Sequence, residues 1–179
     1  RTGSLANSIV SSRLLSRIAR AHGLEHHTTL TGFKWIARAP GLGFGYEEAI
    51  GFCPDPAHVR DKDGIATSVV AASLVAALKA QGRSVWDELE RLARLHGLHV
   101  SSPLTFRVEE IEQIASGMAR LRAQPPSVLA GSPVVEVSDL SQGYRGLPPT
   151  DRVLVLTEAG DRVIARPSGH EPKLQCSLG

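Results

Sequence analysis

The sequence predicts an α/β half followed by an α+β half, with the boundary between Gly97 and Ser102. Strand-like apolar segments alternate with helical patterns through the first half, which favours a parallel sheet layered with helices. In the second half a single amphipathic helix is accompanied by grouped strand patterns, which favours an antiparallel sheet. A chain of 179 residues is long enough for one domain or two small ones, each able to bury a hydrophobic core.

Polar residues mark the helix starts expected in the first half. One serine of the pair 11–12 caps the first helix. The longest helix is apolar nearly all round, which implies burial against a sheet. Ser84 and Asp87 have the spacing of a capping box. The residues of that helix expected to face inward are Trp86, Leu89, Leu92 and Ala93. The expected strands cover 5–11, 25–31 and 48–53, and the expected helices cover 12–21, 66–80 and 84–96.

The second half contains one helix and several strands. Apolar residues recur at three- and four-residue spacing between Val108 and Leu121, which predicts an amphipathic helix. The prolines at 125–126 end it, because proline cannot continue a helix. Two strands joined by a short turn that contains Gly160 form an expected hairpin. The expected extended segments cover 98–108, 133–137, 152–156 and 161–165.

Charge and composition exclude several classes of protein. The chain has 20 basic and 18 acidic residues and 4% aromatic residues, which argues against a nucleic-acid partner. No apolar run approaches the roughly 20 residues of a membrane helix, so no membrane partner is expected. Cys53 and Cys176 lie far apart and fit a reducing, cytoplasmic compartment. The seven histidines have no metal-ligand spacing, so no metal site is expected in this chain.

The most informative loop is 166–173, Arg-Pro-Ser-Gly-His-Glu-Pro-Lys, directly after an expected strand. Arg166 offers a planar fork of donors that matches phosphate oxygens. Ser168 adds a hydroxyl, and Gly169 lets backbone amides turn toward an anion. Lys173 adds a compact positive charge. These features indicate an anion-binding loop, and an ordinary surface turn with basic residues is the alternative.

Two further loops carry polar groups beside aromatic or glycine residues. In Thr-Gly-Phe-Lys-Trp-Ile, residues 31–36, a lysine lies between two aromatic side chains. The alternative is an ordinary loop whose two aromatic side chains fold into the core. The segment 43–51 is rich in glycine and contains Glu47 and Glu48, whose carboxylates suit hydrogen bonds from sugar hydroxyls. Adjacent side chains of an extended segment point to opposite faces, so these two carboxylates are not expected to share one site.

A charged turn, 59–64, precedes the long apolar helix. Asp61 and Asp63 resemble the start of a calcium loop, but no oxygen ligands follow at the required spacing. A positively charged turn near a helix N-terminus suits an anionic ligand. A solvated charged turn is the alternative.

Taken in their order along the chain, the four loops resemble those in the C-terminal part of the α-D-phosphohexomutase superfamily, the phosphoglucomutases and phosphomannomutases. The loop 166–173 resembles the family's phosphate-binding loop, in which threonine usually stands where this chain has His170. Thr-Gly-Phe-Lys at 31–34 and Glu-Glu-Ala-Ile-Gly at 47–51 resemble the sugar loops of the third domain. Arg-Asp-Lys-Asp-Gly at 60–64 is similar to the family's Arg-Glu-Lys-Asp-Gly.

The resemblance implies a fold and a set of site residues. Residues 1–97 would form part of a three-layer α/β third domain, and residues 98–179 a fourth domain with a TATA-box-binding-protein-like α+β fold. The family's catalytic serine and magnesium loop lie in earlier domains, so no catalytic residue and no metal ligand is expected here. The implied substrate-binding residues are Thr31, Gly32, Lys34, Glu47 and Lys62, and the implied phosphate-binding residues are Arg166, Ser168, Gly169, His170 and Lys173.

The implied activity is the interconversion of a sugar 1-phosphate and a sugar 6-phosphate through a phosphoserine and a bisphosphate intermediate, in a cytoplasmic enzyme. Mg²⁺ and a hexose 1,6-bisphosphate activator belong to the full-length enzyme, and its other partners are the hexose phosphate and the N-terminal domains. This chain alone is expected to be inactive. Ala49 stands where many members have a sugar-binding serine, so a phosphopentomutase remains an alternative. The other alternative is a stand-alone, non-catalytic module that binds a sugar phosphate.

Overall fold

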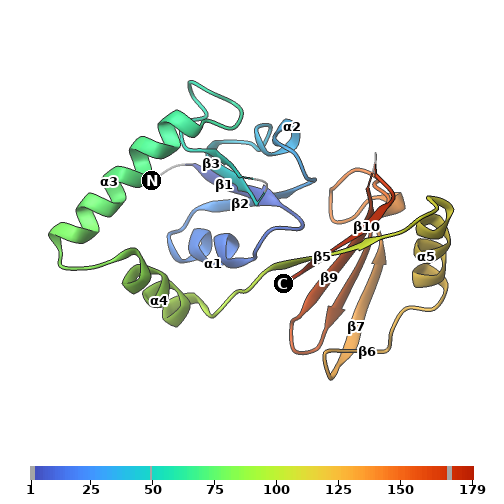
Figure 1. Cartoon of the computed structure of the whole chain (residues 1–179). Coiled ribbons are helices and arrows are strands. Elements are labelled where there is room, and N and C mark those ends of the chain that lie inside the picture. The colour runs from blue at the N-terminus through green and yellow to red at the C-terminus, as the bar shows by residue number, and fades with distance from the viewer. Residues whose placement is uncertain (1–2, 49, 169–170) are drawn as a thin grey trace. The chain divides into compact units, whose positions relative to one another are not determined.

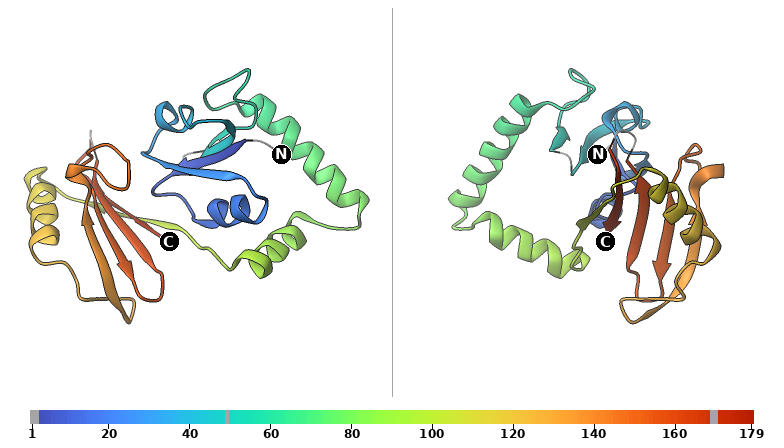
Figure 2. Two further views of the ribbon diagram at one scale, coloured as in Figure 1. Left: turned by 180° about the vertical axis from the view of Figure 1, so that it is seen from behind. Right: turned by 45° about the vertical axis from the view of Figure 1, so that its right-hand side comes forward.

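The computed structural model describes residues 3–48, 50–168 and 171–179. The chain divides into two compact units, Arg1–Val100 and Ser101–Gly179. Figures 1 and 2 show a small sheet with helices in the first unit and a larger sheet with one helix in the second. The expectations for Ala49, Gly169 and His170 fall outside the described residues.

The N-terminal unit is built on a four-stranded mixed sheet in the order β2-β1-β3-β4. β1 pairs in parallel with β2 and β3, as the α/β pattern predicts, whereas β4 runs antiparallel to β3. The strands are β1 (Ser4–Ser8), β2 (Glu25–Thr29), β3 (Leu42–Glu47) and β4 (Gly51–Cys53). The helices are α1 (Leu14–Ala21), α2 (Phe33–Ile36), α3 (Gly64–Ala80) and α4 (Val85–His96).

Strand β3 was not expected, because its glycines disguise the strand pattern. Gly45 serves the packing of α2: a Cβ at this position would lie 2.5 Å from Cγ2 of Ile36. Ile36 and Phe33 of α2 are buried with Ala6 of β1 in the core of this unit. The close approach of α2 to the sheet therefore requires a glycine in the middle of a strand.

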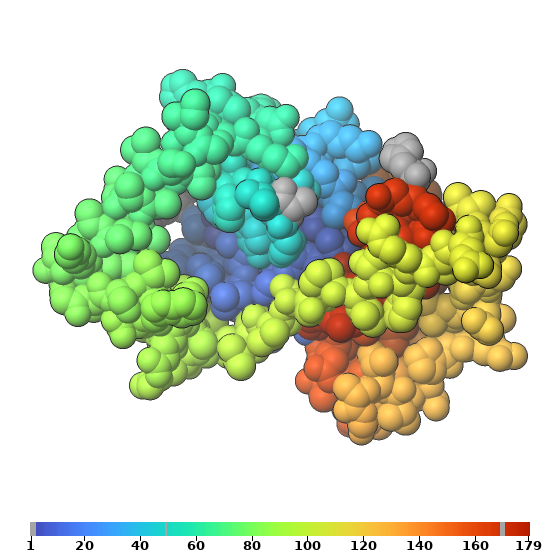
Figure 3. Space-filling model, viewed as in Figure 1, coloured from blue at the N-terminus to red at the C-terminus, as the bar shows by residue number. Residues whose placement is uncertain are grey.

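The prediction that α3 is buried against the sheet is wrong. Ile65 and Val69 are 84% and 63% exposed, and only Leu78, near the end of the helix, is buried. Among the described elements α3 packs mainly against β4, a three-residue edge strand that is too short to cover a 17-residue helix. Figure 3 shows the α3 segment at the surface. Of the four residues of α4 expected to face inward, Trp86 and Leu89 are likewise exposed, whereas Leu92 and Ala93 are half-buried.

Helices α3 and α4 also bear on the question of a membrane span. Within the described residues no single helix has both the length and the apolar composition needed to cross a bilayer. The two helices satisfy these limits only when they are counted together, across a bend of 90°.

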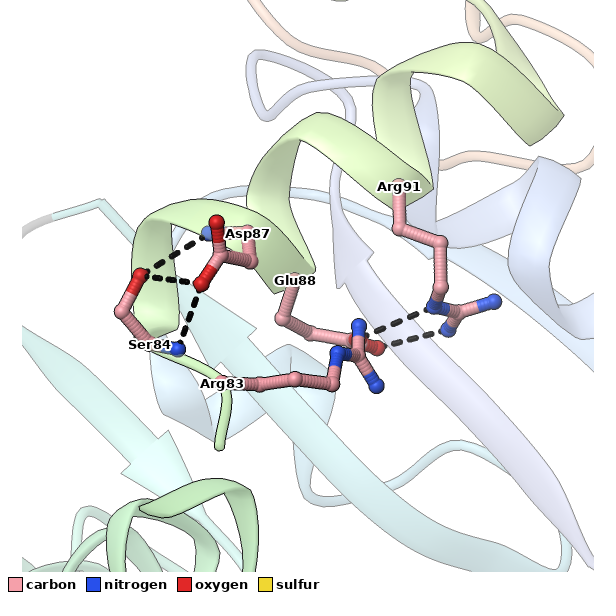
Figure 4. Close-up of polar contacts among 5 residues, drawn as sticks. All are labelled: Arg83, Ser84, Asp87, Glu88 and Arg91. Carbon is pink, nitrogen blue, oxygen red and sulfur yellow. Dashed lines mark hydrogen bonds and ion pairs between the residues drawn. The ribbon is translucent and has the colours of Figure 1, made fainter. Parts of the chain in front are cut away.

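Helix α4 begins with the predicted capping box (Figure 4). The Asp87 amide donates to Oγ of Ser84 at 3.2 Å, and the Ser84 amide donates to Oδ2 of Asp87 at 2.7 Å. One turn on, Glu88 accepts two hydrogen bonds from Arg91, at 2.6 and 2.9 Å, and lies 2.5 Å from Arg83. These local contacts stabilise the helix although most of its apolar side chains remain exposed.

The C-terminal unit is a six-stranded antiparallel sheet in the order β5-β10-β9-β8-β7-β6. The expected hairpin is confirmed as β8 and β9, with Leu156 opposite Arg162. Helix α5 covers one face, where Ile114 and Met118 pack against Val153. The elements are β5 (Ser102–Arg107), α5 (Glu112–Ala123), β6 (Val128–Leu129), β7 (Ser132–Asp139), a short 3₁₀ helix (Leu140–Gln142), β8 (Val153–Thr157), β9 (Arg162–Pro167) and β10 (Lys173–Leu178).

Glu88 should titrate well below an ordinary glutamate. Hydrogen bonds from Arg91, with Arg83 adding to them, lower the pKa of Glu88 from 4.5 to about 2. Because the pKa is lower in the folded state, the carboxylate stabilises α4 above about pH 4.5, and this stabilisation is lost as the pH falls toward 2. An NMR titration of the side-chain carboxyl carbon measures the midpoint. Arg91→Gln should raise it, and Arg94→Gln, which removes the partner of Glu90, should not. A midpoint near 4.5 in the unsubstituted protein would contradict this arrangement.

Candidate functional site

The Glu47 carboxylate is the centre of a polar cluster in the N-terminal unit. It lies at the end of β3 and is 7% exposed. Its Oε2 accepts the backbone N–H of Gly32 at 3.0 Å, and its Oε1 lies 3.2 Å from Nζ of Lys62. A buried carboxylate needs such partners, because burial disfavours the charged form. A carboxylate offers about four acceptor positions, so Glu47 can still accept hydrogen bonds from a ligand.

Two glycines make this cluster possible. Gly32 has φ of 105°, a conformation that favours glycine, and it precedes α2. A Cβ on Gly51 would lie 2.7 Å from Cε2 of Phe33 and 2.9 Å from Cε of Lys62. Without that side chain, Nζ of Lys62 reaches 4.9 Å from the centre of the Phe33 ring while it also faces Glu47. The sequence offered no signal for the role of Gly51 beyond its place in the Glu-Glu-Ala-Ile-Gly segment.

Of the five residues expected to bind substrate in this unit, three are in direct contact: Gly32, Glu47 and Lys62. Thr31 is half-buried and directly precedes Gly32. Lys34 is exposed on α2, with its Nζ 6.0 Å from the centre of the Trp35 ring. The alternative interpretation of this segment is correct for Phe33, which is buried in the core.

Glu48 points away from this cluster, as the alternation of side chains predicts. Its Oε2 accepts from Oγ of Ser11 at 2.6 Å, and its Oε1 accepts from the amide of Ser12 at 3.2 Å. The Ser11 hydroxyl lies 2.9 Å from that of Ser8. Glu48 therefore ties the end of β3 to the turn between β1 and α1, a role that sequence reasoning missed.

The charged turn before α3 positions Lys62. Asp63 is the N-cap of α3, since its Oδ1 accepts from the amide of Ala66 at 2.9 Å. Asp61 accepts from the amide of Lys62 at 2.7 Å. The two aspartates thus organise the backbone on both sides of the lysine that faces Glu47.

The residues of the expected phosphate loop lie at the end of β9, in the turn that follows and at the start of β10. The Ser168 amide donates to the carbonyl of Lys173 at 2.9 Å, and Lys173 forms an ion pair with Glu171. Burial lowers the pKa of Arg166. The Nε of Arg166 is buried and makes no hydrogen bond within the described parts of the chain. A buried guanidinium N–H of this kind suits an anionic acceptor.

Candidate metal ligands do not cluster in the described part of the chain. Among residues 3–48, 50–168 and 171–179, no three His, Cys, Asp or Glu side chains gather as ligands would. The aspartates nearest to such a role, Asp61 and Asp63, accept hydrogen bonds from backbone amides instead.

Comparison with known proteins places the chain in a family. Residues 1–95 match the profile described as phosphoglucomutase/phosphomannomutase, alpha/beta/alpha domain III. A probable phosphomannomutase of Haemophilus influenzae is 41% identical over 176 residues, which cover 98% of this chain and 36% of the relative. A phosphoglucomutase of Staphylococcus aureus is 31% identical over 192 residues, which cover 96% of this chain and 34% of the relative.

A solved structure has a similar fold. The open form of pp63/parafusin, a phosphoglucomutase from Paramecium, superimposes with a TM-score of 0.70 at 18% identity and covers 98% of this chain and 32% of its own. The chain belongs to the phosphoglucomutase/phosphomannomutase family, and it spans about a third of the length of the curated relatives named above.

Gly51→Ala should disrupt the Glu47 cluster, because its Cβ would overlap the Phe33 ring and the Lys62 side chain. Phe33 is buried, so we expect a loss of about 1–3 kcal/mol in the free energy of unfolding, as for other overpacked sites. Urea denaturation measures the change. Gly64→Ala is the control, since its Cβ would meet no atom within 4 Å. Equal stability of the two variants would show that the approach at Gly51 is not tight.

Proposed function

We propose that this chain is the substrate-binding C-terminal part of a phosphohexomutase, an enzyme that interconverts sugar 1-phosphates and sugar 6-phosphates. The observation that carries the proposal lies at the end of β9, where Arg166 keeps a buried N–H without an acceptor in the described part of the chain. The family membership of the chain and the names of its relatives support the same function. We assign residues 98–179 to the family's fourth domain, with a TATA-box-binding-protein-like fold.

The phosphate loop would hold the phosphate that is not being transferred. Arg166 would engage two of its oxygens through the guanidinium fork, and Ser168 and Lys173 would add a hydroxyl and a charge. We expect the amides at Gly169 and His170 to complete this loop. Binding a remote phosphate supplies energy that positions the reacting end of the sugar. A loop that recognises an anion, rather than one face of the sugar, can accept the substrate in both orientations.

The Glu47 cluster would recognise the sugar itself. Glu47 has acceptor capacity beyond Gly32 and Lys62, so it can accept hydrogen bonds from hydroxyl groups. Lys62 is held by the same carboxylate and is 44% exposed, which leaves its ammonium donors available to a hydroxyl or a phosphate oxygen. Thr31 and Lys34 flank Gly32 in the chain and would extend this surface.

Chemistry at the phosphoryl group would belong to the rest of the enzyme. The serine that carries the phosphate, Mg²⁺ and the response to a bisphosphate activator are assigned to the other domains, which are the partners of this chain. The residues described here would bind and orient the hexose phosphate, and the 179 residues alone are not expected to catalyse the reaction.

Arg166→Gln should weaken the binding of glucose 6-phosphate to this chain. Loss of a charge-assisted, two-point contact is expected to cost about 2–4 kcal/mol of binding free energy. Isothermal titration calorimetry measures the dissociation constant. Arg166→Lys should recover only part, because an ammonium group cannot reproduce the fork.

Arg145→Gln is the matched control for this experiment. Arg145 lies in the same unit, is 71% exposed and pairs with Glu136. The Arg145→Gln chain should bind glucose 6-phosphate with the same dissociation constant as the unsubstituted chain. If the dissociation constant of Arg166→Gln lies within twofold of that of the unsubstituted chain, the assignment of the phosphate loop is refuted.

A further inference from the structure

A row of polar side chains crosses the sheet of the C-terminal unit next to the phosphate loop. Strand pairing places Arg166 of β9 directly opposite Gln175 of β10. The neighbouring pair, Val153 opposite Ala165, places Arg152 beside Arg166 on its other flank. Val153 and Ala165 pack against α5, and side chains alternate along a strand. Arg152, Arg166 and Gln175 therefore lie together on the face opposite α5.

Further cations follow on the same face toward the turn. Lys173 lies two residues before Gln175 on β10, and Arg107 of β5 is directly opposite Lys173. Glu171 forms an ion pair with Lys173, which lowers the pKa of the Glu171 carboxyl. The nearby charge of Arg107 lowers this pKa further, by a smaller amount. The four cations Arg107, Arg152, Arg166 and Lys173 thus gather at one end of one sheet face.

Arg152 is the most buried of these cations, at 7% exposure. Burial, with the charge of Arg166 as a second cause, lowers the pKa of Arg152 to about 10. Two neighbouring guanidinium groups repel each other, and burial removes part of the hydration of both. A phosphate group between them would offset both costs, because each guanidinium donates charge-assisted hydrogen bonds to phosphate oxygens.

We propose that Arg152 is a second phosphate-binding arginine, which holds the same phosphate group as Arg166 from the neighbouring strand. The proposal rests on the function proposed above and extends the phosphate site beyond the loop 166–173. Its ligand is a phosphate monoester, such as the phosphate group of a sugar phosphate. Arg152 lies outside the recognisable loop, and strand register alone brings it to the site.

This role makes a distinctive prediction about stability. A purely structural arginine contributes equally to stability with and without ligand, whereas a ligand-binding arginine contributes more when the anion is bound. Arg152→Met removes the charge and the N–H donors while it keeps a similar side-chain length. The phosphate-induced rise in melting temperature should therefore be smaller in Arg152→Met than in the unsubstituted chain.

The experiment compares the 179-residue chain with Arg152→Met, Arg152→Lys, Arg166→Met and the control Arg145→Met. Calorimetric titration uses glucose 6-phosphate and inorganic phosphate as probes, and thermal unfolding is followed with and without each probe. Arg152→Met should weaken the binding of both probes about tenfold or more and reduce the phosphate-induced rise in melting temperature. Arg152→Lys should be intermediate, and Arg145→Met should behave as the unsubstituted chain.

Three outcomes would overturn the inference. If Arg166→Met weakens binding and Arg152→Met does not, Arg152 is no phosphate ligand, while the proposed function stands. If Arg152→Met lowers the phosphate-free melting temperature but keeps the phosphate-induced rise, the role of Arg152 is structural. If neither probe binds the unsubstituted chain, the proposed function and this inference fail together. Should Arg152→Met fail to fold, Arg152→Lys decides: unchanged binding overturns the inference, and severalfold weaker binding supports it.

Discussion

The ion pair between Glu47 and Lys62 organises the candidate site of the N-terminal unit. A carboxylate that is 7% exposed must be compensated, and three separate segments converge to do so. Gly32 supplies an N–H at a backbone conformation that favours glycine, Gly51 leaves room, and the charged turn before α3 presents Lys62. The charge of Glu47 is therefore balanced, and its position fixed, by contacts within this unit before any ligand binds. In the C-terminal unit, by contrast, four cations gather at one end of one sheet face.

Much of the fold followed from local patterns in the sequence. The capping box at Ser84, the hairpin around Gly160 and the amphipathic helix α5 are confirmed, because each depends on residues a few positions apart. Strand β3 was missed, since Gly45 carries no strand signal and its value lies in the approach of Ile36. The burial of α3 was predicted wrongly, because an apolar helix indicates a need for contact but not whether a surface is there to meet it.

The candidate site was predictable only as far as its motifs extend. Strand alternation correctly separated Glu47 from Glu48, and the structure joins Glu47 to Gly32 and Lys62. The packing role of Gly51 and the position of Arg152 beside Arg166 could not be predicted in the same way. The first depends on a distance between side chains that are far apart in sequence, and the second on strand register, which is set by the whole sheet.

The central claim is that the turn between β9 and β10 binds the phosphate of a sugar phosphate. Its most direct test is an NMR titration of the isotopically labelled chain with glucose 6-phosphate, which follows every resolved backbone amide. The account predicts saturable shifts at Ser168, Lys173 and Gln175, and unchanged amides along α4, whose hydrogen bonds and ion pairs are local. Saturable shifts elsewhere with none at this turn, or no shifts at millimolar ligand, would contradict it.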